Sequence, residues 1–199
     1  MKHNLRKVLR AKRRALRARD YRLWSSLAAS AIARLAAFKS GARIAMYLPV
    51  RGETDTAALI ASARRRGIRI FVPVVTDLRH RRVRFHPLTG KTRPGTYGIR
   101  VPENFSRRRG EAVGPRWFNL VVVPLVGIDH KGHRLGMGGG FYDRAFAFRR
   151  LRRRWRGPHL VGLAFECQKV ESISRDLWDL KLDAVATESG IEYFGRDFR

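Results

Sequence analysis

Apolar residues recur at steps of three and four positions along the first part of the chain. Leu5, Leu9 and Leu16 belong to this series, and alanines and arginines fill many of the positions between them. This spacing is typical of amphipathic helices, in which one face is apolar and the other is polar. We expect two helices within Asn4–Phe38, separated by a cap or turn at Asp20.

Short apolar segments then alternate with helical ones through the rest of the chain. Strands are predicted over Arg43–Leu48, Ile68–Val75, Arg82–Pro87, Leu120–Val123, His159–Ala164, Leu182–Ala186 and Ile191–Phe194, and further helices over Thr54–Arg66 and Phe141–Arg154. The segment Leu120–Val123 is apolar without alternation, which indicates a central strand covered on both faces. This order predicts an α/β fold: a single three-layer α/β/α domain over residues 1–199 with a central, mostly parallel sheet.

The net charge is the most unusual feature of the composition. Lys and Arg number 43 against 16 Asp and Glu, which gives a formal net charge of +27. Such a chain attracts polyanions, including nucleotides and nucleic acids. The arginines are spread over nearly the whole chain, whereas a dedicated nucleic-acid-binding arm would concentrate them in one block. We interpret most of them as a compositional bias, and we keep a basic nucleic-acid-binding protein as the alternative function.

The sequence also indicates where the protein works. No apolar run approaches the roughly 20 residues needed to cross a bilayer, and residues 1–19 lack the apolar stretch of a secretory signal. Cys167 is the single cysteine, so an intramolecular disulfide and a multi-cysteine metal site are excluded. We expect a cytoplasmic monomer that makes no membrane contact.

Candidate chemistry is concentrated in the segment Arg134–Arg144, which reads RLGMGGGFYDR. Its four glycines let the backbone approach a ligand and direct several N–H groups toward one point. The helix predicted behind them would add its positive end, and Arg134 and Arg144 would add cationic donors. Asp143 is placed to hold a magnesium ion between phosphate oxygens. The segment predicts a triphosphate site, and the alternative is a glycine turn with solvated arginines.

This segment resembles the RLGxGxGYYDR signature of the 5-formyltetrahydrofolate cyclo-ligases. Further segments resemble that family in matching order: KHNLR at Lys2–Arg6, IAMYLPVRGETDT at Ile44–Thr56, LVVVPLVGIDHKG at Leu120–Gly132 and LDAVATE at Leu182–Glu188. Two positions depart from the signature. Met137 stands where many members have an aromatic or basic residue, and Phe141 keeps the ring of a tyrosine but lacks its hydroxyl.

The resemblance implies an ATP-dependent ligase that converts 5-formyltetrahydrofolate into 5,10-methenyltetrahydrofolate, with release of ADP and phosphate. ATP would phosphorylate the formyl oxygen, and N10 of the folate would then attack the formyl carbon. Arg134 and Lys2 would be the catalytic cations. Mg²⁺ would be the cofactor, held by Asp143 and Asp183; the alternative for Asp183 is a structural ion pair with an arginine.

The resemblance also implies the two binding sets and the partners. ATP would contact Lys2, His3, Asn4, Leu5, Arg6, Arg134, Leu135, Gly136, Met137, Gly138, Gly139, Gly140, Phe141 and Tyr142. The folate, with or without a polyglutamate tail, would contact Arg6, Leu48, Glu53, Met137, Gly138, Gly139, Gly140 and Phe141. A carboxylate such as Glu53 suits a pterin ring, which presents adjacent N–H donors, although Glu53 taken alone reads equally well as a helix-start residue. Other polyanion binding would be incidental.

Overall fold

The structure is a computed structural model that describes residues 2–50, 52–95, 98–105, 112–151 and 157–195. Its helices and strands follow one another as α1 (Lys2–Arg14), α2 (Ala18–Ala33), β1 (Arg43–Ala45), α3 (Ala57–Arg65), β2 (Arg69–Asp77), β3 (Arg82–Pro87), β4 (Thr92–Pro94), β5 (Arg100–Pro102), η3 (Pro115–Trp117), β6 (Leu120–Pro124), β7 (Gly127–Asp129), β8 (Arg134–Leu135), α4 (Phe141–Ala145), η4 (Ala147–Leu151), β9 (His159–Leu163), η5 (Glu166–Gln168), β10 (Lys169–Val170), β11 (Ala184–Thr187) and β12 (Gly190–Tyr193). The η elements are short 3₁₀ helices.

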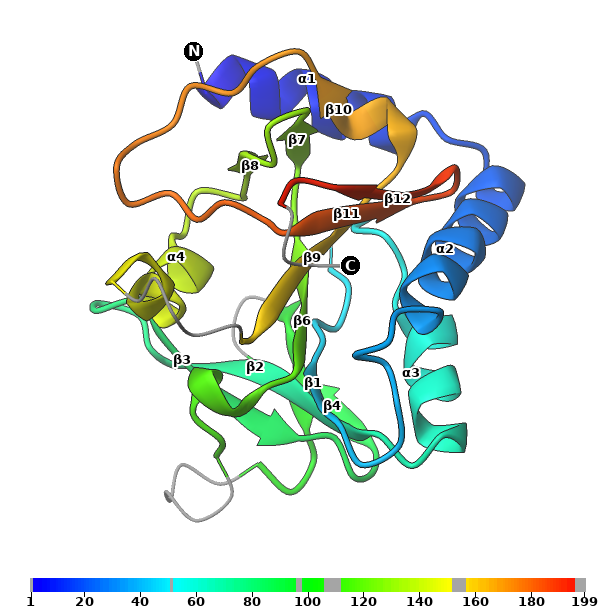
Figure 1. Ribbon diagram of the computed structural model, residues 1–199, viewed down its shortest axis with the longest axis vertical. Helices are drawn as coiled ribbons and strands as arrows, with labels where there is room; N and C mark the ends of the chain where they lie inside the picture. Colours follow the sequence, from blue (N-terminus) through cyan, green and yellow to red (C-terminus); the bar gives the residue numbers. More distant parts are fainter. Residues whose placement is uncertain (1, 51, 96–97, 106–111, 152–156, 196–199) are drawn as a thin grey trace.

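A seven-stranded sheet crosses the middle of the molecule in the order β12-β11-β9-β6-β1-β2-β3 (Figure 1). Its five inner strands pair in parallel, and only the edge strands β12 and β3 pair antiparallel. Strand β6 lies at the centre, and Leu120 to Val123 are almost completely buried there. The apolar run without alternation is therefore a central strand, and the predicted α/β fold with a mostly parallel sheet is confirmed.

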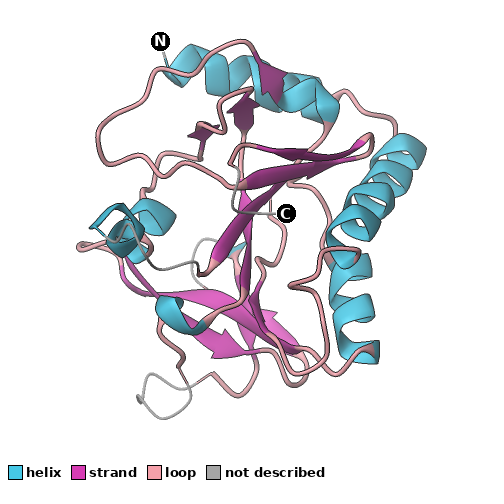
Figure 2. Ribbon diagram, in the orientation of Figure 1, coloured by secondary structure: helices cyan, strands magenta, loops and turns pink. Residues whose placement is uncertain are grey.

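Helices cover the two faces of this sheet unequally. On one face lie the helices α2 and α3 (Figure 2). They pack through a cluster that includes Ile32, Leu59 and Val122. On the other face, the cluster includes Phe85 of β3 and Phe146, and the described helices beside it include the short α4 and η4. The second helical layer is thus thinner than the sequence predicted. Within the described residues, no helix combines the length and the apolar character that a bilayer crossing requires.

Several predicted boundaries differ from the observed ones. Asp20 does not separate the first two helices, because it lies in the first turn of α2, where it pairs with Arg17 at 2.9 Å. The helix expected over Phe141–Arg154 is α4, which ends at Ala145, followed by η4; residues 152–154 lie outside the described part of the chain. The fully buried Phe146 joins the sheet core at this break. The small sheets β10-β7-β8 and β4-β5 were not predicted.

The helix α1 lies beside the small sheet β10-β7-β8 at the top of Figure 1. Its buried Leu9 forms a separate small cluster with Val126, Leu135 and Ile173. The Leu9 side chain occupies the space beside Gly127, since a Cβ atom at that glycine would come within 2.5 Å of Leu9 Cδ1. One leucine therefore accounts for much of the apolar anchoring of α1.

Replacing Leu9 with alanine is expected to lower the free energy of unfolding by about 2–5 kcal/mol, because the small cluster cannot refill the cavity. Urea denaturation followed by circular dichroism measures this change. The control is Leu23→Ala on α2, where the side chain is 51% exposed, and its expected effect is within about 0.5 kcal/mol. Equal effects of the two substitutions would contradict this account of α1.

Candidate active site

A cavity of about 660 Å³ opens beside the loop that joins β8 to α4. Lys2, Arg6, Glu53 and all of residues 134–143 line it. These residues come from the start of α1, from the loop after β1 and from the glycine loop, which we define as residues 136–140. The fold therefore brings residues that are more than 100 positions apart to one cavity, and most of the predicted site residues are among them.

The glycine loop adopts a backbone that few other residues tolerate. Gly138 has a φ of +100° and Gly140 a φ of +65°, both in the left-handed region. A Cβ atom at Gly136 would come within 2.9 Å of Arg134 Nη1, so this glycine leaves room for the guanidinium group. Arg6 Nε donates a hydrogen bond to the carbonyl oxygen of Gly136 at 2.8 Å, which ties α1 to the loop.

The short helix behind the loop changes the electrostatic prediction. The sequence predicts a long helix whose positive end faces the glycines, but α4 has only five residues. Few peptide dipoles are therefore aligned at this point. Positive charge at the cavity comes from guanidinium and ammonium groups instead.

Arg134 is the most enclosed cation of the cavity, with 8% of its surface exposed. Its Nη2 donates to Asp143 Oδ1 at 2.8 Å, and its guanidinium carbon lies 5.9 Å from the centre of the Tyr142 ring. Its buried Nε finds no hydrogen-bond partner among the described residues. A buried donor without a partner is costly, and such donors commonly meet a ligand or water. Arg134 therefore has hydrogen-bonding capacity left for an anion.

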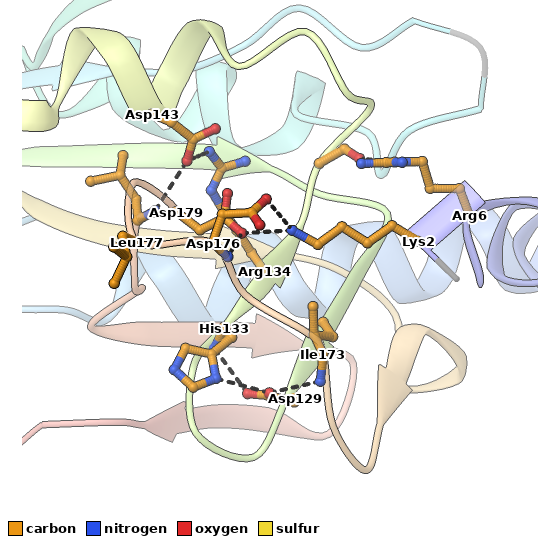
Figure 3. Close-up of polar contacts among 12 residues, drawn as sticks. Lys2, Arg6, Asp129, His133, Arg134, Asp143, Ile173, Asp176, Leu177 and Asp179 are labelled. Carbon is orange, nitrogen blue, oxygen red and sulfur yellow. Dashed lines mark hydrogen bonds and ion pairs between the residues drawn. The ribbon is translucent and has the colours of Figure 1, made fainter. Parts of the chain in front are cut away.

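Lys2 reaches the cavity from the first turn of α1 and is held by two carboxylates. Its Nζ lies 2.8 Å from Asp176 Oδ2 and 2.9 Å from Asp179 Oδ2, as Figure 3 shows. Burial lowers the pKa of Lys2, but the hydrogen bonds and negative charge of the two aspartates outweigh it and raise that pKa. The ammonium group stays charged at any physiological pH. Its ion pairs with Asp176 and Asp179 connect the start of α1 to the loop before β11.

Glu53 is the buried acid of the cavity, with 6% exposure. Its Oε2 accepts a hydrogen bond from the Val50 N–H at 3.1 Å, and its carbonyl oxygen accepts one from the Tyr21 hydroxyl at 2.5 Å. Burial raises the pKa of the Glu53 carboxyl, and the Val50 hydrogen bond and the charge of Arg13 only partly oppose this shift. The carboxylate is held in place with one oxygen available to a ligand's N–H groups.

Five predicted site residues do not line this cavity. His3 lines a neighbouring cavity of about 420 Å³, which it shares with Arg6 and Met137. Asn4 is exposed, and Leu5 and Leu48 pack against core clusters. Leu5 and Leu48 are therefore positioned to support the site residues rather than to touch a ligand in the cavity.

Asp183 is the fifth residue that the structure does not bring to the cavity. Its two carboxylate oxygens accept hydrogen bonds from Arg149 Nη2 at 2.8 and 2.9 Å, and Oδ2 also accepts one from the Leu160 N–H at 2.7 Å. It precedes β11, and Leu160 lies near the amino end of the adjacent β9. This is the ion pair with an arginine that the sequence left open as the alternative to a metal role.

The cavity also contains residues that sequence reasoning did not select. Asp176, Trp178 and Asp179 come from the loop before β11, and Arg81 comes from the turn between β2 and β3. Their spacing in the sequence does not identify them as site residues. Asp179, for example, contacts Lys2 across a separation of 177 positions. Trp178 is 60% exposed and Met137 is 41% exposed, so the rim of the cavity is partly apolar above a charged floor.

Comparisons with known proteins show which family the chain resembles. The model of the 5-formyltetrahydrofolate cyclo-ligase family matches residues 1–188. The chain is 30% identical over 186 residues to the 5-formyltetrahydrofolate cyclo-ligase of Escherichia coli strain K12, which covers 92% of this chain and 98% of that protein. It is 33% identical over 144 residues to the enzyme of the same name from Haemophilus influenzae, covering 70% of this chain and 72% of that one.

A solved structure extends the likeness to the fold. The NMR structure of Aquifex aeolicus 5,10-methenyltetrahydrofolate synthetase superposes with a TM-score of 0.79 at 30% sequence identity. The likeness covers 100% of this chain and 94% of that one. The ordered motifs, the shared fold and the match over residues 1–188 lead to one conclusion: the chain belongs to the 5-formyltetrahydrofolate cyclo-ligase family.

Proposed function

We propose that this protein catalyses the ATP-dependent cyclisation of 5-formyltetrahydrofolate to 5,10-methenyltetrahydrofolate, with release of ADP and phosphate. Family membership supports this reaction. The observation that carries it to particular residues is the cavity, where Arg134, Glu53 and the glycine loop meet. It offers a charged floor for phosphates and a buried carboxylate beside an apolar rim for a ring system.

The reaction needs positioning more than covalent help from the protein. The formyl group is an amide, so its carbon resists attack and its oxygen leaves poorly. Transfer of the γ-phosphoryl group of ATP to that oxygen, with release of ADP, creates a good leaving group. N10 of the same folate then attacks the carbon, and phosphate departs as the five-membered ring closes. The protein must hold the formyl oxygen in line with the γ-phosphorus and stabilise the spreading negative charge.

The described residues divide these tasks by their chemistry. The N–H groups of the glycine loop, the Arg134 guanidinium and the Lys2 ammonium would face the phosphates. Arg134 would act directly, because its Nε has no other partner among the described residues. Lys2 would exchange part of its contact with Asp176 and Asp179 for a phosphate oxygen.

The folate would lie on the Glu53 side of the cavity. A carboxylate accepts two adjacent N–H groups of a pterin, and such charge-assisted hydrogen bonds are short and strong. Trp178 and Met137 at the rim offer flat or flexible apolar surface for the ring systems. Phe141 lines the same cavity as a ring without a hydroxyl, so it contributes packing and no hydrogen bond to the substrate.

The donor set of the cavity fits a magnesium ion carried by the nucleotide. The described residues contain no group of three metal-ligating side chains, and Mg²⁺ bound to a nucleotide needs only one or two carboxylates besides phosphate and water. Asp143 would hold it: Oδ1 accepts hydrogen bonds from Arg134 and from the Leu180 N–H, whereas no described group donates to Oδ2. When bound, Mg²⁺ would neutralise charge on the phosphates.

Replacing Asp143 with asparagine is expected to raise the Mg²⁺ concentration needed for half-maximal rate by about tenfold or more. The asparagine keeps an oxygen for Arg134 but lacks the negative charge that attracts the metal. A titration of activity with MgCl₂ after treatment with a chelator measures the shift. Unchanged Mg²⁺ dependence in this variant would argue that the metal is held by phosphate and water alone.

Turnover of the purified protein tests the proposed reaction directly. The protein is mixed with 5-formyltetrahydrofolate, ATP and MgCl₂, and the near-ultraviolet absorbance of the methenyl product is followed. ADP release, measured in parallel, should match product formation one to one and should require the folate. A folded protein that forms no methenyl product under these conditions would refute the proposal.

A further inference from the structure

A second concavity of about 610 Å³ adjoins the candidate active site. We define the arginine groove by its four cationic residues: Arg81, Arg82, Arg84 and Arg144. They come from the end of the β2–β3 turn, from β3 and from α4. Arg81 lines both this groove and the active-site cavity. The two hollows are therefore neighbours that share one guanidinium side chain.

The arginine groove is strongly cationic, with one acid among its lining residues. None of its four arginines forms an ion pair with a described acidic residue. The groove's one acid, Asp77, is already engaged by the N–H of His80 at 2.9 Å and by its Nδ1 at 2.7 Å. By contrast, Lys2 and Arg134 in the active-site cavity each contact a carboxylate.

Unpaired arginines are unavoidable in a chain with 43 cationic and 16 acidic residues. Four of them line one concavity that meets the proposed substrate site. The cavity beside α1 is also cationic, through Arg6, Lys7, Arg10 and Arg14, so charge alone does not single out the arginine groove. A concave surface of one charge sign raises the local concentration of ligands of the opposite sign. The arginine groove is therefore suited to an extended anion whose other end lies in the active-site cavity.

The backbone at Arg81 provides a separate indication. Arg81 has a φ of +52°, and among the described residues it is the one non-glycine residue with a positive φ. Glycine or asparagine would adopt this conformation more readily. Backbone strain of this kind is concentrated at functional sites, where the side chain is what the position requires. Here the turn places the Arg81 side chain against both hollows, with Nη1 3.7 Å from the Cβ position of Gly140.

We propose that the arginine groove binds the glutamate tail of a polyglutamylated folate substrate. This inference rests on the proposed function, because the folate supplies the other end of the ligand. Each added glutamate brings one carboxylate on a flexible chain, and guanidinium groups bind carboxylates through paired N–H donors. Spaced arginines suit such a ligand, since each contact is weak on its own and several act together.

The test compares substrates with one and with five glutamates. In the wild-type protein, KM for the five-glutamate substrate is expected to be about tenfold lower than KM for the monoglutamate. In the double variant Arg82→Gln/Arg84→Gln, this ratio should fall to near one while turnover of the monoglutamate is retained. Arg81 is left unchanged because it also lines the active-site cavity.

A matched control separates a local site from general attraction by the net charge. The variant Arg64→Gln/Arg65→Gln removes the same charge from two exposed arginines at the end of α3, and it should keep the wild-type ratio. An equal loss in both double variants would overturn the proposal in favour of long-range steering. A wild-type ratio near one would also overturn it.

KM for ATP distinguishes the tail from the triphosphate as the occupant. If the groove variant raises KM for ATP equally with either folate, the groove serves the nucleotide and the proposal is wrong. Failure of the proposed function itself would be seen separately, as absence of monoglutamate turnover in the wild-type protein. In that case, direct titration of the folded protein with the five-glutamate folate decides whether the groove binds a polycarboxylate, and no difference from the groove variant overturns the inference.

Discussion

Replacing Arg134 with lysine is expected to lower kcat/KM for 5-formyltetrahydrofolate by about a hundredfold or more, with the fold retained. Arg134 is 8% exposed and already donates to Asp143, while its buried Nε has no hydrogen-bond partner among the described residues. A planar guanidinium group can serve both partners at once, whereas an ammonium group is a single point charge. Lysine would keep the charge balance with Asp143 and lose the additional N–H donors that we propose to face the reacting phosphoryl group.

The matched control is Arg149→Lys, because Arg149 makes a comparable ion pair with Asp183 at 2.8 Å outside the cavity. Its kcat/KM is expected to stay within about twofold of wild type, since this part-buried pair lies outside the cavity and lysine keeps the positive charge beside Asp183. Steady-state kinetics and thermal unfolding are measured for both variants. If Arg134→Lys keeps more than half of the wild-type rate, or if Arg149→Lys loses as much, the assigned role of Arg134 is wrong.

Replacing Glu53 with glutamine is expected to raise KM for the folate by about 10- to 100-fold, with KM for ATP nearly unchanged. The Glu53 carboxylate is buried and would accept two N–H groups of the pterin. A glutamine side chain has one acceptor oxygen and a competing NH₂ donor. The carbonyl oxygen of the glutamine can still accept the Val50 hydrogen bond, so the loop should keep its conformation.

The same substitution should stabilise the protein at neutral pH. Burial raises the pKa of Glu53, so the folded state binds this proton more tightly than the unfolded state does. Stability from this group is therefore greatest below the ordinary glutamate pKa, about 4.3, and it declines as the pH rises through the raised pKa. Glu53→Gln removes that decline, so its Tm should exceed wild type at pH 7 and converge with it in acid.

In the wild-type protein, activity should change with pH in the opposite direction to the stability contributed by Glu53. As the pH falls through the raised pKa, Glu53 becomes neutral and loses an acceptor for the pterin, so kcat/KM for the folate should decrease. This decrease of kcat/KM at low pH should be absent in Glu53→Gln. The control Asp55→Asn changes an acid two residues away that accepts the Ala57 N–H and does not line the cavity. This control variant should still show the decrease. A wild-type Tm above that of Glu53→Gln at pH 7 would contradict the assigned burial cost.

Periodicity predicted the sheet well because local constraints specify it strongly. β3 has the bounds Arg82–Pro87, where the sequence predicts a short strand. β6 follows from four consecutive apolar residues, since a strand covered on both faces needs such a run. The helix after the glycine loop was predicted too long. Phe146 is drawn into the core between α4 and η4, and residue spacing alone does not reveal that demand.

The glycine loop and the cations near it could be found from the sequence because their chemistry is local. Glycines with positive φ, an arginine before them and an aspartate after them lie within eleven consecutive positions. Lys2, Arg6 and Glu53 were assigned only through the resemblance to a family. Neither local chemistry nor the resemblance identified four other residues of the cavity, because they reach it from loops whose paths depend on packing. These residues are Arg81, Asp176, Trp178 and Asp179.

The layered α/β architecture, the central strand and the glycine loop can be predicted from residue order, because backbone sterics and apolar spacing act between near neighbours. Which charged side chains pair with one another depends on the folded arrangement. Lys2 forms ion pairs with Asp176 and Asp179, Arg134 forms one with Asp143, and Arg149 forms one with Asp183. Ion pairing depends on distance in space, and in a chain with so many more cations than acids each acid has many candidate partners that only the folded arrangement distinguishes.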